Sequence, residues 1–311
     1  MPVAFRPVLL KDLYKTEKAV FSVEVFPPKS PKGDSALFRT LEKLVPYGPA
    51  FISCTYGAGG STRERTVELC QEIQSRYHVT ATAHLSCVGA TRTELTSLIE
   101  RIHDHGIVNI MALRGDPPEG ADSFQPIPGG LRYANELVAL IREVRPGMGV
   151  GVAGYPEKHR EAPDLATDLA YLKKKVETGA DAVFTQLFYI NEHFFRFREL
   201  YEQAGITVPL VPGIMPVTEF KRIQRITQLC GAEFPQRLSE QLEAVKDDPK
   251  AQFEIGVEYA IRQCNELLQE GVPGIHFYVL NKSEACERIL EALQLKSEHP
   301  LKDETQNDSE G

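Results

Sequence analysis

The stretch "GVGVAGYPEKHREAPDLATDLAYLKKKVETGADAVFTQLFY", residues 149–189, decides the fold. Residues 149–155 and 181–189 are short, mostly apolar runs of the kind that form buried strands. Between them, residues 164–179 carry apolar side chains at helical spacing, and Gly179 stands where a helix would end. Continuous rather than alternating apolar strands are typical of parallel sheets covered by helices. The stretch therefore predicts a strand–helix–strand unit with parallel strands.

The same arrangement recurs along the whole chain. The eight candidate strands lie at residues 20–26, 50–56, 79–87, 107–115, 149–155, 181–189, 208–214 and 274–280. Capping boxes at Ser61–Glu64 and Thr91–Glu94 mark two of the helix starts that follow them. Eight such units predict an α/β fold, a single (β/α)8 TIM barrel.

Two parts of the chain depart from this repeat. The gap between the seventh and eighth strands is longer than the others, and the patterns "FPQRLSEQLEAV" and "AQFEIGVEYAIRQCNELLQEG" predict an extra helical insertion there. We expect the barrel to occupy residues 1–295. Residues 296–311 are polar and acidic, and predict a disordered tail.

Composition limits the classes of function. The 311 residues carry a net charge of −8, which argues against nucleic acid or an anionic membrane surface as partner. No apolar run approaches the roughly 20 residues that span a bilayer, and the start lacks the apolar core of a secretory signal, so a cytoplasmic location is expected. Six cysteines without CxxC or zinc spacing predict reduced thiols and no metal site.

Polar residues stand at the carboxyl ends of the predicted strands, where TIM barrels build their active sites. In chain order they are Glu24, Thr55, His84, Arg114, Asp116, Tyr155, Gln186, Gly213, Tyr278 and Asn281. Any one of them can be an ordinary turn residue, but the whole ring predicts a ligand site. Glu24 stands out, because a carboxylate between Val23 and Val25 is costly unless it has a partner or a chemical role.

Several motifs leave their role open. "YGAGGST" (56–62) is neither a dinucleotide fingerprint nor a Walker A loop, and is either a plain turn or a loop that a flat ligand approaches closely. "LRGDPP" (113–118) is either an Arg–Asp turn or a charged ligand loop. His84 either faces a ligand or makes a structural hydrogen bond. A retaining glycosidase is disfavoured, because the chain has no Trp to form a sugar platform.

Eight motifs in order carry a family resemblance. They are "FSVEVFPPK", "CTYGAGGSTRERT", "TAHLSC", "NIMALRGDPP", "VAGYPEKHREA", "GADAVFTQLFY", "VPGIMPV" and "GIHFYVLNK". Over about residues 21–293 the chain resembles the methylenetetrahydrofolate reductase family, whose fold is a TIM barrel. Longer members carry a C-terminal regulatory domain, so the resemblance implies the short, bacterial type.

The resemblance implies an oxidoreductase of one-carbon metabolism and methionine biosynthesis. NADH or NADPH reduces FAD, and the flavin then reduces 5,10-methylenetetrahydrofolate to 5-methyltetrahydrofolate, in two hydride transfers. The positions implied to contact FAD are Thr55, His84, Arg114, Gly115, Asp116, Tyr133, Ala134, Ala153, Tyr155, His159, Ala162, Asp168 and Lys175. The positions implied to contact folate are Glu24, Asp116, Gln186, Tyr278 and Lys282. Homo-oligomers are common in the family.

Two residues are implied to be catalytic. Glu24 is the implied acid that protonates folate, and its apolar neighbours predict a pKa raised towards neutrality. Asp116 is expected near the flavin and pterin, where its charge would tune the flavin and orient the substrate. Lys282 replaces the usual Arg, while Arg222 and Ile226 replace a Gln and a Phe of some bacterial members. The alternatives are another flavin- or deazaflavin-linked reductase on this barrel, or a folate- or pterin-binding barrel without turnover.

Overall fold

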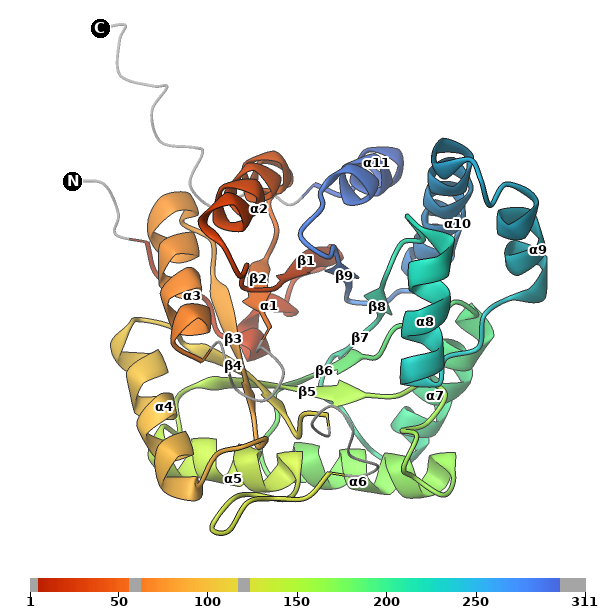
Figure 1. The fold of residues 1–311 in the computed structure, drawn as a ribbon. Coiled ribbons are helices and arrows are strands. Elements are labelled where there is room, and N and C mark those ends of the chain that lie inside the picture. The colour runs from red at the N-terminus through yellow and green to blue at the C-terminus, as the bar shows by residue number, and fades with distance from the viewer. Residues whose placement is uncertain (1–4, 56–62, 117–123, 297–311) are drawn as a thin grey trace, which may run out of the picture.

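A computed structural model describes residues 5–55, 63–116 and 124–296 (Figure 1). Its strands are β1 (Val20–Val25), β2 (Phe51–Cys54), β3 (Ala81–Ser86), β4 (Asn109–Leu113), β5 (Gly149–Gly154), β6 (Ala182–Thr185), β7 (Leu210–Val211), β8 (Gly213–Ile214) and β9 (Gly274–Tyr278). They form one sheet in the order β7-β6-β5-β4-β3-β2-β1-β9-β8, and every pair is parallel.

The predicted seventh strand is split in two at Pro212. β7 pairs with β6, and β8 pairs with β9, so this split strand joins the two ends of the sheet into a barrel. Proline has no backbone N–H to donate, but the Pro212 carbonyl still accepts a hydrogen bond from His276 N at 2.9 Å. The eight predicted strands are therefore all present, and the prediction of a TIM barrel is confirmed.

Most of the helices cover the outside of the barrel, and the first, short helix lies at its amino end (Figure 1). They are α1 (Leu10–Leu13), α2 (Pro31–Leu44), α3 (Arg63–Tyr77), α4 (Arg92–Asp104), α5 (Ala134–Val144), α6 (Leu165–Glu177), α7 (Asn191–Gln203), α8 (Phe220–Cys230), α9 (Gln236–Ala244), α10 (Pro249–Gln269) and α11 (Glu284–Leu293), with a 3₁₀ turn at Val45–Tyr47. Three of them, α8 to α10, lie between β8 and β9. None of the described helices is both long and apolar enough to cross a membrane.

Local sequence signals explain where helices begin and end. Thr91 and Glu94 form the predicted capping box at the start of α4. The start of α6 is capped by Asp164, whose side chain accepts a hydrogen bond from Thr167 N at 2.8 Å. Past the end of α6, Gly179 adopts a φ of 125°, and a Cβ there would collide with Arg142. Ser61 of the other predicted capping box lies outside the described residues, and so do residues 297–311 of the predicted tail.

The amino end of the barrel is closed by the N-terminal segment. Asn109, the first residue of β4, accepts a hydrogen bond from Leu10 N at 2.9 Å and donates one to Val8 O at 2.8 Å. Leu10 is fully buried in an inner cluster with Phe51 and Phe184. Since this end is filled, a ligand has access to the barrel only from the carboxyl ends of the strands.

Candidate active site

Three strands bring a carboxylate and two imidazoles together at the carboxyl end of the barrel. Glu24 on β1 lies with its Oε2 3.3 Å from His84 Nε2 of β3 and 3.5 Å from His276 Nε2 of β9. The Glu24 side chain is 19% exposed, whereas the His276 side chain is 1% exposed. Glu24 therefore has partners, and it is also the member of this cluster that solvent or substrate reaches most readily.

The predicted direction of the Glu24 pKa is wrong. Burial alone would raise it, but the charge of His84 and the hydrogen bond from His276 outweigh burial and lower the pKa to about 2. The apolar neighbours Val23 and Val25 belong to the core outside the barrel, so they do not surround the carboxylate. Glu24 is therefore a carboxylate that faces two imidazoles and keeps its charge.

Sequence reasoning missed His276. It stands two residues before Tyr278 on the same strand, so both side chains point to the barrel interior. The period-two pattern of "IHFYV", with polar residues alternating with apolar ones, was the available signal. The spacing shows which face His276 occupies, but not that β1 and β9 are neighbours.

Of the residues implied to hold folate, Tyr278 lies beside this cluster. Tyr278 pairs with Glu24 across the sheet and donates its hydroxyl hydrogen to Thr185 O at 2.7 Å. Gln186 follows directly after β6, and its Oε1 accepts a hydrogen bond from Leu187 N. Lys282 is exposed in the loop after β9. Of the residues that depart from the family pattern, Ile226 on α8 packs in the same apolar cluster as Tyr278.

We predict that Gly213→Ala destabilises the barrel beside Tyr278. A Cβ at this position would lie 2.3 Å from Thr185 O and 2.7 Å from the Tyr278 hydroxyl, and a buried backbone carbonyl cannot easily move. Overpacking of this kind costs about 1–3 kcal/mol. Thermal denaturation should show a melting temperature several degrees lower, at roughly 2–4 °C per kcal/mol for a large domain.

The matched control is Gly147→Ala, where a Cβ would meet nothing within 4 Å. This variant should melt like the parent protein. Equal melting temperatures for Gly213→Ala and Gly147→Ala would show that the split strand is not tightly packed at Gly213.

The residues implied to hold the cofactor form a second, charged group after β4 and β5. Arg114 makes two hydrogen bonds to Glu161, at 2.6 and 2.8 Å, and these raise the pKa of the guanidinium. His159 lies edge-on to Tyr155 with ring centres 4.8 Å apart. The His159 backbone N–H donates to Asp168 at 2.9 Å, which fixes the loop to the start of α6.

Lys175 supplies a buried cation to this group. Its Nζ donates to the carbonyl of Ala153, and burial lowers the pKa of its ammonium to about 8. Burial also raises the pKa of Asp168, the nearest carboxylate to Lys175. Arg114, His159 and Lys175 thus form a concentration of positive and hydrogen-bonding groups in a protein that is acidic overall.

The other implied cofactor positions share the carboxyl side of the barrel. Ala162 is buried in the loop after β5, Thr55 and Gly115 are half-buried after β2 and β4, and Tyr133 and Ala134 lie at the start of α5. Asp116 is exposed. The pKa of the Cys230 thiol is raised mainly by its burial and, to a smaller extent, by the charge of Asp116. The loop 56–62 and the prolines of "LRGDPP" lie outside the described residues.

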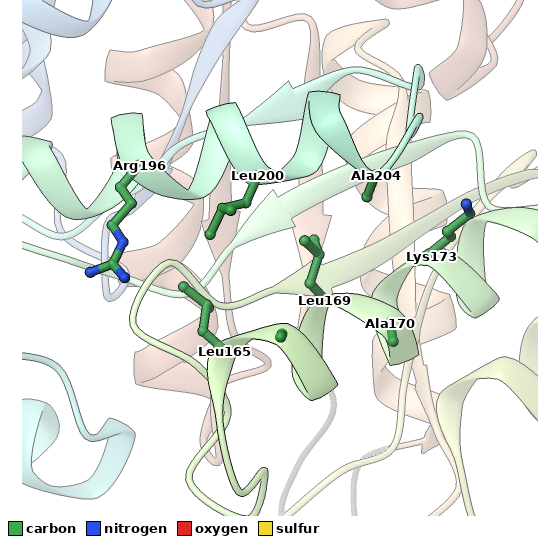
Figure 2. Close-up of a pocket in the computed structure, with 8 residues that line it drawn as sticks. Leu165, Leu169, Ala170, Lys173, Arg196, Leu200 and Ala204 are labelled. Carbon is green, nitrogen blue, oxygen red and sulfur yellow. The ribbon is translucent and has the colours of Figure 1, made fainter.

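A groove of about 420 Å³ between α6 and α7 is separate from both groups (Figure 2). Leu165, Leu169 and Leu200 line it, with Lys173 and Arg196 also at its edges. None of the predicted site residues lines this groove. Within the described parts of the chain, no group of His, Cys, Asp and Glu is arranged to hold a metal ion.

The family model for methylenetetrahydrofolate reductase matches residues 9–294. The chain belongs to this family. Methylenetetrahydrofolate reductase (NADH) 1 of Arabidopsis thaliana is 40% identical over 302 residues, covering 94% of this chain and 51% of the plant protein. The chain thus spans about half the length of the plant relatives that it matches.

A bacterial member of the family matches over most of its length. The 5,10-methylenetetrahydrofolate reductase of Escherichia coli is 34% identical over 275 residues, covering 88% of this chain and 90% of the bacterial protein. Among solved structures, a Clostridium thermocellum protein that binds two copies of 5-methyl-5,6,7,8-tetrahydrofolic acid matches with a TM-score of 0.60. That match is 16% identical and covers 93% of this chain and 99% of the other, so it supports the barrel fold.

Proposed function

We propose that this member of the methylenetetrahydrofolate reductase family reduces 5,10-methylenetetrahydrofolate to 5-methyltetrahydrofolate, with FAD as cofactor and NADH or NADPH as reductant. The observation that carries the proposal is the position of Glu24. It is a partly exposed carboxylate, backed by two imidazoles, inside the open end of a barrel whose same rim holds the cationic group around Arg114. A cytoplasmic location and a homo-oligomer remain predictions.

The residues present fit a flavin dinucleotide. His84 Nε2 is buried, and its contact with Glu24 is not a well-aligned hydrogen bond, so this nitrogen retains capacity for a ligand. Arg114 and Lys175 can offset the two charges of a pyrophosphate. His159 and Tyr155 place aromatic surface beside these cations. FAD, when bound, would supply the hydride transfer between the nicotinamide and the folate.

The chain itself supplies the proton chemistry. When the five-membered ring of the substrate opens, the bond between the bridging methylene carbon and N10 breaks. The electron pair stays on N10, and N10 gains a proton. Glu24 is the exposed member of a cluster that can hold that proton and pass it on. Tyr278 lies on the strand next to Glu24, and Gln186 follows the end of β6 on the same side of the barrel, where the two side chains would orient the pterin and benzoyl groups.

The test is an anaerobic assay of the purified protein with FAD, NAD(P)H and methylenetetrahydrofolate. The expected result is stoichiometric FAD and formation of 5-methyltetrahydrofolate. Bound FAD with no folate product would favour another flavin-linked reductase. Deazaflavin-dependent turnover without FAD would favour the deazaflavin alternative, and folate binding without turnover would favour a binding barrel.

We predict that Glu161→Gln strengthens the binding of FAD. In the ligand-free chain Glu161 occupies the guanidinium of Arg114, so a pyrophosphate must compete with it. The Glu161 side chain is 46% exposed, so solvent weakens the ion pair, and the gain is about 1 kcal/mol, or roughly fivefold in affinity. Titration of the apoprotein with FAD, followed by flavin fluorescence, measures this change.

Glu143→Gln is the matched control, because Glu143 forms an exposed ion pair with Arg92, and neither residue is among those implied to contact FAD. Its FAD affinity should equal that of the parent. Weaker binding in Glu161→Gln would show that Glu161 helps to hold the cofactor rather than competing with it.

A further inference from the structure

We propose that His276 is a positioning residue for the acid that protonates the substrate, and that Glu24, His84 and His276 hold the transferable proton as one cluster. The inference rests on the proposed function and adds to it a residue and a proton store. Its physical basis is a continuous chain of polar contacts across three strands, from Ser22 through His276 and Glu24 to His84.

The imidazole of His276 is fixed on every side. Its Nδ1 lies 2.7 Å from the hydroxyl oxygen of Ser22, and its Nε2 faces Glu24. Its ring stacks on Phe51 with centres 5.7 Å apart, and the ring of Phe184 meets it edge-on at 5.2 Å. Tyr278 packs edge-on against the same ring at 5.3 Å, and a ring held by two polar and three aromatic contacts cannot turn its Nε2 away from the carboxylate.

Burial separates the roles of the three groups. His276 is 1% exposed, so it cannot touch a ligand in the barrel mouth. Glu24 is 19% exposed and stands between the two imidazoles. His276 must therefore act through Glu24, by holding the carboxylate in place and by sharing the proton with it.

The proton balance of the cluster follows from its composition. When N10 of the substrate takes a proton from the cluster, the cluster loses one unit of positive charge, and solvent must return a proton before the next turnover. Glu24 lies 3.3 Å from His84 and 3.5 Å from His276, so a proton on one imidazole is within reach of the carboxylate between them. Among the described residues, Tyr278 and Cys54 interact with the charge of Glu24, and Tyr14 lies beside Ser22.

The first experiment reads the imidazoles directly and does not depend on activity. Protein labelled with ¹⁵N in histidine is titrated by NMR, and the ring signals of His84 and His276 are assigned from His84→Gln and His276→Gln. In the parent, the carboxylate stabilises protonated imidazole. In Glu24→Gln the titration midpoints of both rings should fall, by about one pH unit or more for at least one of them.

His103 on the exposed end of α4 is the internal reference, and its midpoint should not change. Unchanged midpoints for His84 and His276 in Glu24→Gln would overturn the shared cluster. The NMR titration does not require folate reductase activity, so failure of the cluster and failure of the proposed function remain distinguishable.

The second experiment tests positioning. Ser22→Ala removes the contact to Nδ1 but keeps the imidazole, and His276→Gln keeps a hydrogen-bond donor but removes the titratable ring. Both should slow the folate reaction about 10- to 100-fold, as expected when a reacting group is misplaced. Reduction of bound flavin by NAD(P)H and the KM for folate should stay within a few-fold of the parent.

The pH profile separates positioning from a general structural effect. His276→Gln should move the pH midpoint of the folate reaction, because one member of the cluster no longer titrates, and Ser22→Ala should retain a titrating ring. Equal losses in both half-reactions, or a slower folate reaction with an unchanged pH midpoint in His276→Gln, would show that His276 only supports the fold.

Discussion

Glu24→Gln should separate the two half-reactions of the proposed cycle. Glutamine keeps the size and a hydrogen-bonding group, but it removes the negative charge that faces the two imidazoles. Reduction of a flavin by a nicotinamide requires no proton delivered to folate, whereas opening of the methylene bridge does. General acid catalysis is typically worth about 10²–10⁴-fold, or roughly 3–5 kcal/mol of barrier.

Anaerobic stopped-flow absorbance measures both halves. Bleaching of the flavin by NAD(P)H should stay within several-fold of the parent, and reoxidation by methylenetetrahydrofolate should slow by at least about two decades. Glu42→Gln, on the exposed face of α2, is the control and should leave both halves unchanged. A parallel fall in both halves would assign Glu24 a structural role, and an unchanged folate reaction would mean that another group delivers the proton.

The second large effect is expected for Arg114→Ala, which should weaken the binding of FAD. Arg114 is the best-placed cation after β4, with its guanidinium 5.2 Å from the centre of the Phe124 ring and its hydrogen bonds directed at an anion. A charge-assisted contact contributes about 1.5–3 kcal/mol, which is roughly a 10- to 150-fold change in dissociation constant. Titration of the apoprotein with FAD gives this value.

Arg92→Ala is the matched control, because it removes an exposed ion pair to Glu143, and neither residue is among those implied to contact FAD. Its affinity for FAD should not change. Combining Arg114→Ala with Glu161→Gln sharpens the test: with Arg114 absent, the Glu161 substitution should no longer strengthen binding. Unchanged affinity in Arg114→Ala would place the pyrophosphate elsewhere on the rim.

The spacing of apolar residues and the helix-capping residues in the sequence were enough to predict the barrel. Buried parallel strands such as residues 149–155 are apolar throughout, and capping residues such as Thr91 mark where the helices begin. Both signals are local, so they survive without knowledge of the tertiary structure. The sequence shows a proline at position 212, but it does not show that the seventh strand divides there, because a proline can also stand at the edge of a strand.

The rim residues were predictable for the same reason. Any residue at the end of a barrel strand is placed on the catalytic side by topology alone, and this applies to Glu24, His84 and Arg114. What each residue contacts was not predictable. The partner of Arg114 is Glu161, 47 positions away, and the ion pair exists because the loop after β5 folds back beside the end of β4.

The sequence by itself determined the family, the barrel and the positions of the polar residues on its rim, because strand periodicity and short motifs are encoded locally. Only the tertiary structure decided the state of Glu24. In the sequence, His276 and Glu24 are 252 positions apart. They meet because the last strand pairs with the first when the barrel closes. Two imidazoles beside the carboxylate outweigh its burial, so closure of the barrel lowers a pKa that the flanking valines alone would have raised.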